Sequence, residues 1–186
     1  QNLLDPGSTP MENMQFLTFL CAVLKGVDEY ASLLRISASS AGNDHRLGAN
    51  EAPPAIISIF MGEELQGVLD ALENNTTYKS ESREFKIGVH ALPDFPKDST
   101  DRNRTSPFAF TGNRFEFRMV GSADNIACPN HMLNTIVAGE LCEIADAMEK
   151  VAPEEFEAKL KELLVSIIKE HKRIIFNGDG YSDEWV

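Results

Sequence analysis

The feature that most restricts the fold is a run of alternating polar and apolar side chains between Arg114 and Met119. Successive side chains of a β-strand point to opposite faces, so this run predicts a strand with one charged and one apolar face. The apolar face would pack into the core. The charged face would be solvated, ion-paired or occupied by a ligand, because an unpaired buried charge is costly. The charged face would carry Arg114, Glu116 and Arg118. The apolar face would carry Phe115, Phe117 and Met119.

This strand ends a segment rich in arginine. Four arginines and one glutamate lie between Asp101 and Arg118, in an otherwise apolar, strand-like sequence. Arginine presents a rigid fork of donors to carboxylate and phosphate oxygens, and a carboxylate between two arginines can neutralise them or face a divalent cation. The segment therefore predicts an anion-binding site. The alternative is a ladder of surface ion pairs on a half-exposed strand.

Composition indicates one globular domain over residues 1–186, with 42% hydrophobic and 25% charged residues. The net charge of −12 argues against nucleic acid or an anionic membrane surface as a partner. Basic residues nevertheless outnumber acidic ones, seven to five, between Arg83 and Arg118, where the anion site is predicted. No apolar run reaches the roughly 18 residues needed to span a membrane. Three scattered cysteines indicate a reduced, cytoplasmic protein in which they serve as packing residues.

Hydrophobic spacing and capping residues predict a chain that mixes helices with strands. Thr9 and Pro10 have the character of an N-cap and a first-turn proline. Strands and helices do not alternate strictly, which favours an antiparallel α+β fold over a doubly wound one. The predicted elements are helices over 10–34, 63–72, 129–150 and 154–172, strands over 55–61, 83–89 and 108–120, and a loop over 37–54.

Three ordered motifs make the chain resemble a known family. RNRTS at 102–106 and RFEFR at 114–118 resemble the RNRS and RxExR motifs near the end of the catalytic domain of glutamine synthetases. HRLGANEAPPAI at 45–56 resembles the segment of that family that contains EAP, and it precedes RNRTS as it does there. The amino-acid sequence in and around these motifs is most similar to that of the type III branch. The resemblance implies that residues 1–186 are the C-terminal part of a catalytic domain, with a mixed, mainly antiparallel sheet packed with helices.

The resemblance also implies roles for four of these residues. Arg104 corresponds to a catalytic arginine that contacts the transferred phosphate of ATP, and Arg114 to one that contacts the phosphates of the nucleotide. Glu116 corresponds to the carboxylate that completes the metal site nearer ATP. Arg118 corresponds to the arginine that binds the carboxylate of the substrate glutamate. The cofactors implied are ATP and Mg²⁺ or Mn²⁺, and an internal ion pair is the alternative role for each residue.

The first motif contributes two further candidates. Arg46 corresponds to a substrate-binding arginine. Glu51 corresponds to a catalytic acid on a flap that shields the acyl phosphate from water and helps to deprotonate ammonium. Such a lid suits a reactive acyl phosphate, which water would otherwise hydrolyse. The spacing from Arg46 to Glu51 is one residue shorter than in the best-known form, so an exposed loop acid is the alternative for Glu51.

Two positions depart from the family pattern or add to it. Ala109 stands where the best-known form carries another arginine, and Arg102 or Arg83 would substitute for it unless the type III branch binds phosphate differently. His45, beside the first motif, is expected to be a solvated loop histidine rather than a ligand.

The activity implied is ATP-dependent formation of glutamine from glutamate and ammonia through γ-glutamyl phosphate. The other metal ligands of the family precede the matched region, and the sequence opens at Gln1 without an initiator methionine. We therefore expect a piece of a longer protein, inactive alone, whose parent is a homo-oligomer, dodecameric in the type III form. Two alternatives stay open: a non-catalytic module for assembly or regulation, and a γ-glutamylamine synthetase that uses a larger amine.

Overall fold

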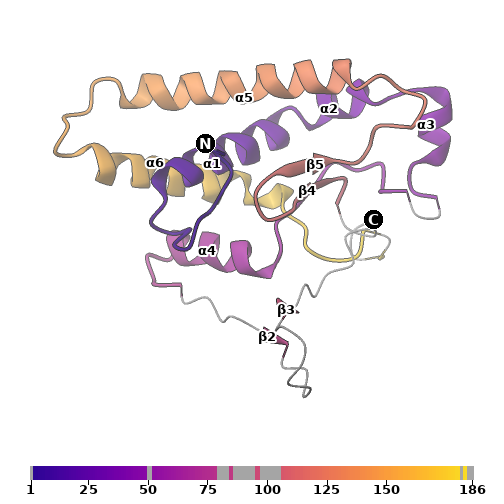
Figure 1. The fold of residues 1–186 in the computed structure, drawn as a ribbon. Helices are drawn as coiled ribbons and strands as arrows, with labels where there is room; N and C mark the ends of the chain where they lie inside the picture. The colour runs from indigo at the N-terminus through magenta and orange to yellow at the C-terminus, as the bar shows by residue number, and fades with distance from the viewer. Residues whose placement is uncertain are drawn as a thin grey trace.

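The computed structural model of the chain describes residues 2–49, 52–78, 84–85, 95–96, 106–180 and 182–183. In Figure 1, α5 runs along the top of the molecule, α1 and α6 lie below it, and β4 and β5 lie near α1. The helices are α1 (Met14–Glu29), α2 (Ala31–Ser37), α3 (Ala41–Arg46), α4 (Glu63–Glu73), α5 (Ala127–Met148), α6 (Phe156–His171) and the short 3₁₀ helix η1 (Lys172–Ile174). The strands are β1 (Ile59–Phe60), β2 (Glu84–Phe85), β3 (Phe95–Pro96), β4 (Phe108–Phe110) and β5 (Phe115–Phe117).

The main sheet is small and mixed, with the strand order β1-β4-β5. β1 pairs with β4 in parallel, placing Ile59 opposite Phe108. β4 pairs with β5 antiparallel, placing Ala109 opposite Glu116, and β2 pairs antiparallel with β3. The predicted α+β class, with a mixed and mainly antiparallel sheet packed with helices, is therefore confirmed.

A tight hairpin joins β4 to β5. The Thr111 N–H donates to the Arg114 carbonyl oxygen at 2.9 Å, and Gly112 has a φ of +99°. A side chain with a Cβ rarely adopts this backbone conformation, so glycine suits the turn. The strand region predicted over 108–120 thus consists of two strands of three residues each.

Several predicted boundaries were wrong for local reasons. Helix α1 begins at Met14 rather than Pro10, because the Asn13 side chain accepts the Phe16 N–H at 3.0 Å and caps the helix there. The predicted helix over 10–34 also breaks at Tyr30, and α2 starts at Ala31. The predicted loop over 37–54 contains the helix α3. Much of the strand predicted over 83–89 lies outside the described residues.

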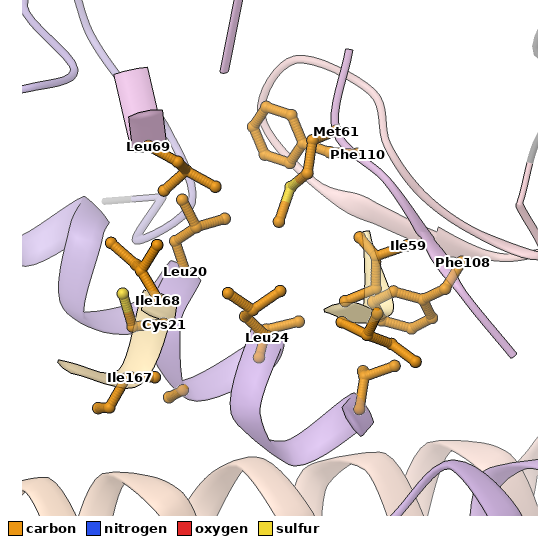
Figure 2. Close-up of a cluster of buried hydrophobic side chains, with 14 of the residues drawn as sticks. Leu20, Cys21, Leu24, Ile59, Met61, Leu69, Phe108, Phe110, Ile167 and Ile168 are labelled. Atoms are coloured by element: carbon orange, nitrogen blue, oxygen red, sulfur yellow. The ribbon is translucent and has the colours of Figure 1, made fainter. Parts of the chain in front are cut away.

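Helix α1 forms the centre of the hydrophobic core. Nine of its sixteen residues are buried, and all five positions from Leu20 to Leu24 are among them. A helix buried around most of its circumference needs neighbours on several sides, which here are α5, α6 and the sheet. In Figure 2, Leu24 of α1 lies between Ile59 and Phe108 of the sheet and Ile168 of α6.

The cysteines do not all share the predicted packing role. All three are free thiols, and Cys21 is fully buried in α1, where burial raises the pKa of its thiol to about 12. Cys128 and Cys142 are exposed on α5, so the packing role predicted for them was wrong. In the described part of the chain, no helix has both the length and the apolar character to cross a membrane.

Gly26 sets the close approach of α1 to α5. A Cβ built at Gly26 would lie 2.5 Å from Ile136 Cγ2 and 3.3 Å from Glu140 Cγ. We expect Gly26→Ala to destabilise the fold, because overpacking costs about 1–3 kcal/mol, which exceeds the ~1 kcal/mol that alanine adds to helix propensity. The urea midpoint of unfolding, followed by circular dichroism, measures the change.

Gly139 supplies the matched control within α5. A Cβ at this exposed position would meet no atom within 4 Å. Gly139→Ala should therefore raise stability by up to about 1 kcal/mol through helix propensity alone. Equal effects of the two substitutions would contradict the close packing of α1 on α5.

Candidate functional site

The strand β5 carries the predicted charged face at the protein surface. The side chains of Arg114 and Glu116 are 70% and 37% exposed, and Arg114 Nη2 lies 3.4 Å from Glu116 Oε1. An ion pair this exposed contributes at most about 1 kcal/mol to stability. The pair is therefore weakly held, and both groups can turn toward a ligand.

The opposite face of β5 packs on the core as the alternation predicts. Met119 is fully buried, whereas Phe115 and Phe117 are half-buried. The ring of Phe108 lies 5.1 Å from that of Phe115 and 5.8 Å from that of Phe117, measured between centroids. These separations are typical of attractive aromatic pairs, which hold β5 against the core.

Arg118 lies one residue beyond β5, where the chain leaves the sheet. Its backbone N–H donates to the Pro107 carbonyl oxygen at 2.7 Å, and its Nη2 donates to the Ser106 carbonyl oxygen at 2.7 Å. A guanidinium carries five N–H donors, so it can hold a protein carbonyl on one side and a carboxylate on another. The half-buried position suits such a role, because solvent and salt screen the charge less there.

The Ser106 carbonyl group that accepts from Arg118 belongs to a buried pair of hydrogen-bonded serines. Ser58 Oγ donates to Ser106 Oγ at 2.6 Å, and Ser106 Oγ donates to the Phe176 carbonyl oxygen at 3.0 Å. Both serines are completely buried. This chain of hydrogen bonds joins the residues before β1, the residues before β4 and the C-terminal segment. Satisfied buried networks specify a single geometry, so the anchor of Arg118 is itself fixed.

Arg46, at the end of α3, is hydrogen-bonded to the segment that follows β5. Its Nε donates to Asn43 Oδ1 at 3.0 Å, and its Nη2 donates to the Met119 carbonyl oxygen at 3.1 Å. Met119 directly follows Arg118. The fold thus ties Arg46 to the residue next to Arg118, although these two predicted substrate-binding arginines are far apart in sequence.

Polar contacts fix the short helix α3 that carries Arg46. Ser40 is its N-cap, and the Ser40 hydroxyl donates to Asp124 Oδ1 at 3.2 Å. Arg35 Nη2 and Ser39 Oγ donate to the carboxylate of Asp44 at 2.8 and 2.9 Å. The hydrogen bond from Arg35, followed by that from Ser39, lowers the pKa of Asp44. A helix of six residues is too short to be stable alone, so these contacts keep it in place.

The remaining predicted positions have different outcomes. Glu51 and Arg104 lie outside the described residues, as do Arg83 and Arg102. Ala109 is fully buried in β4, opposite Glu116. His45 is exposed, in agreement with the expectation of a solvated histidine.

Glu116 is the residue predicted to bind a metal. A partly exposed carboxylate on a strand is a suitable oxygen ligand for Mg²⁺ or Mn²⁺. Within the described residues, however, no group of three or more His, Cys, Asp or Glu side chains is placed to hold an ion. Glu116 can therefore supply one ligand of such a site but not the whole site.

Sequence reasoning missed the residues that support the two arginines. Asn43 and the Ser58–Ser106 pair carry no motif of their own. The spacing of Asn43 and Arg46 by three positions was a usable signal, because residues so spaced are neighbours on a helix surface. This signal could be used only if a helix had been predicted at α3, where the sequence analysis predicted a loop.

The comparisons with known proteins agree with the motifs. Residues 159–186 match the family described as the glutamine synthetase C-terminal domain. A Type-3 glutamine synthetase of Dictyostelium discoideum is 49% identical over 99% of this chain and 25% of its own length. A glutamine synthetase of Butyrivibrio fibrisolvens is 49% identical over 100% of this chain and 26% of its own length. A glutamine synthetase of Bacteroides fragilis is 47% identical over 99% of this chain and 26% of its own length.

These matches confirm the predicted resemblance to the glutamine synthetase family, and the name of the Dictyostelium protein agrees with the predicted similarity to the type III branch. The chain spans about a quarter of the length of the relatives it matches.

Proposed function

We propose that the full-length protein carrying these residues is a glutamate-ammonia ligase that forms glutamine with ATP through γ-glutamyl phosphate. The observation that carries the proposal is the hydrogen bond from Arg46 to the carbonyl oxygen of Met119, the residue that directly follows Arg118. Each guanidinium binds a protein acceptor, and a guanidinium has the fork of N–H donors that matches a carboxylate. The names of the relatives support the same kind of reaction.

The described residues would divide the work of binding. Arg118 and Arg46 would bind and orient glutamate, which brings its side-chain carboxylate to the γ-phosphate of ATP. Arg114, at the exposed hairpin, would bind the phosphates of the nucleotide. Holding the two reactants in line accounts for much of the catalysis in phosphoryl transfer, because the transition state is loose and mainly needs positioning and charge stabilisation.

The other proposed components act on the same intermediate. Arg104 would stabilise the phosphate while it is transferred, and Glu51 would cover the acyl phosphate and take a proton from ammonium. Glu116 would supply one oxygen ligand to Mg²⁺ or Mn²⁺, and such an ion neutralises the charge that develops on the phosphate oxygens. The homo-oligomeric assembly implied by the resemblance and the cytoplasmic location indicated by the cysteines stay predictions.

The test is an assay of the full-length protein with glutamate, ammonium, ATP and Mg²⁺ or Mn²⁺. We expect glutamine, ADP and phosphate to form in equal amounts, because one acyl phosphate is consumed for each amide made. The 186-residue chain alone, assayed in parallel, should give no turnover. Omission of ammonium should stop the release of phosphate if the acyl phosphate is protected from water.

Two outcomes would contradict the proposal. Absence of glutamine under all these conditions would remove the ligase assignment. Faster turnover with methylamine or ethylamine than with ammonium would assign a γ-glutamylamine synthetase instead.

A further inference from the structure

Asn43 is a buried polar residue to which no role has yet been assigned. It is 4% exposed, and its carboxamide makes three hydrogen bonds. Nδ2 donates to the Ala38 carbonyl oxygen at 2.5 Å and to the Met119 carbonyl oxygen at 2.9 Å. Oδ1 accepts from Arg46 Nε at 3.0 Å. The side chain therefore connects the end of α2, the segment after β5 and the candidate arginine on α3.

These contacts engage one particular edge of the Arg46 guanidinium. Nε and Nη2 lie on the same edge, and this edge meets Asn43 Oδ1 and the Met119 carbonyl oxygen. The adjacent edge, formed by Nη1 and Nη2, is the one that can meet a carboxylate end-on with two parallel hydrogen bonds. On that edge, Nη1 makes no hydrogen bond to the described residues, and Nη2 carries a second N–H besides the one donated to Met119.

Asn43 and Met119 together fix the plane of the guanidinium. A single acceptor would leave the group free to turn about that hydrogen bond, whereas two acceptors on one edge define its orientation. Asn43 also binds the Met119 carbonyl group itself, so both acceptors belong to one rigid unit. Arg46 then need not lose further side-chain freedom when it binds an anion.

We propose that Asn43 is a positioning residue that aims the Nη1/Nη2 edge of Arg46 at a carboxylate of the bound substrate. The inference rests on the proposed function, because it takes the anion to be glutamate. It adds to that function the residue that sets the geometry of Arg46.

The test compares substitutions in the full-length protein by glutamate KM, kcat and unfolding temperature. Asn43→Ala should raise the glutamate KM about 10-fold, the lower end of what misplacing a positioned group costs. The ATP KM should stay unchanged. Asn43→Asp keeps an acceptor for Arg46 Nε but loses both donors. It should lower the unfolding temperature as Asn43→Ala does, but raise the glutamate KM less than Asn43→Ala does, because the acceptor for Arg46 Nε remains.

Three further variants separate positioning from folding. Arg46→Ala combined with Asn43→Ala should give the glutamate KM of Arg46→Ala alone, because Asn43 acts through Arg46. Arg46→Lys leaves Asn43 in place but lacks the two-edged guanidinium, so its glutamate KM should also rise. Asn13→Ala removes another asparagine that holds a helix, the cap of α1, and should lower the unfolding temperature without changing the glutamate KM.

The outcomes distinguish this inference from the proposed function. If Arg46→Ala raises the glutamate KM but Asn43→Ala does not, or if their effects add, Asn43 has no positioning role. An unchanged KM in Arg46→Lys would overturn the inference even if Asn43→Ala does not fold. If the full-length protein forms no glutamine, or Arg46→Ala leaves the KM unchanged, the functional assignment of Arg46 fails and the inference fails with it.

Discussion

Replacing Lys25 with methionine is expected to destabilise the fold by about 3–5 kcal/mol, the typical cost of removing one partner of a buried ion pair. Lys25, on α1, makes hydrogen bonds to Glu140 and Glu143 of α5, and it lies 3.7 Å from Glu29. The side chain of Glu140 is only 2% exposed. Without the lysine, its carboxylate would stay buried without a cation. Urea unfolding followed by circular dichroism measures the loss.

Two control variants test this explanation. Lys25→Met combined with Glu140→Met removes both charges and keeps the volume, so most of the lost stability should return. Lys159→Met removes one partner of the exposed Lys159–Glu162 pair, whose side chains are 50% and 68% exposed. It should cost less than about 1 kcal/mol. A small effect of Lys25→Met, similar to that of Lys159→Met, would show that Glu140 is not isolated from water as the structure indicates.

The pH dependence of the Lys25 contribution has a defined sign. Burial opposes the charge, but the hydrogen bonds to Glu140 and Glu143 outweigh burial, so the pKa of Lys25 is raised above its ordinary value of 10.5. The folded state thus holds the proton more tightly than the unfolded chain does. The stabilisation is complete below the ordinary pKa and is lost as the pH rises through the raised one. The difference in stability between the unmodified chain and Lys25→Met should therefore shrink only at strongly alkaline pH.

Arg118→Ala in the full-length protein is expected to raise the glutamate KM by about 10- to 100-fold, since hydrogen bonds to charged groups contribute about 1.5–3 kcal/mol. The physical reason is the loss of a half-buried guanidinium that the Ser106 carbonyl oxygen holds at 2.7 Å. Arg118→Lys should lose most of the same affinity, because an ammonium cannot bind that carbonyl group and a bidentate carboxylate together. Initial rates over a range of glutamate concentrations measure both effects.

Arg114→Ala is the control from the same strand. Arg114 is 70% exposed at the hairpin and is proposed to bind nucleotide phosphates, so its loss should raise the ATP KM and leave the glutamate KM nearly unchanged. If Arg118→Ala leaves the glutamate KM unchanged while lowering the unfolding temperature, Arg118 has a purely structural role as a link to Ser106.

The long helices could be predicted from hydrophobic spacing. Helices predicted over 63–72, 129–150 and 154–172 correspond to α4 (Glu63–Glu73), α5 (Ala127–Met148) and α6 (Phe156–His171) within a few residues. Such segments carry enough apolar positions at helical spacing to show which face will be buried. The same signal identified α1, but not its exact ends.

Elements that depend on contacts with distant residues could not be predicted in this way. The start of α1 was predicted from Thr9 and Pro10, but the Asn13 side chain accepts the Phe16 N–H and caps the helix instead. Helix α3 is too short to have a periodic signal, and Asp124 holds its N-cap Ser40. The strands also proved shorter than the apolar runs that predicted them, because pairing in the sheet ends before the runs do.

The sequence by itself determined the chemistry available to this protein: the α+β class, the acidic balance with a basic segment, and the motif residues Arg46, Arg114, Glu116 and Arg118. Only the tertiary structure decided how these groups are held. It ties Arg46 to Asn43 and to Met119, the residue after Arg118, and it ties Arg118 to Ser106 of the buried Ser58–Ser106 pair. The reason is that a hydrogen bond between residues distant in the chain leaves no local pattern. A side chain that binds a backbone carbonyl group also places no demand on the identity of the residue that supplies it.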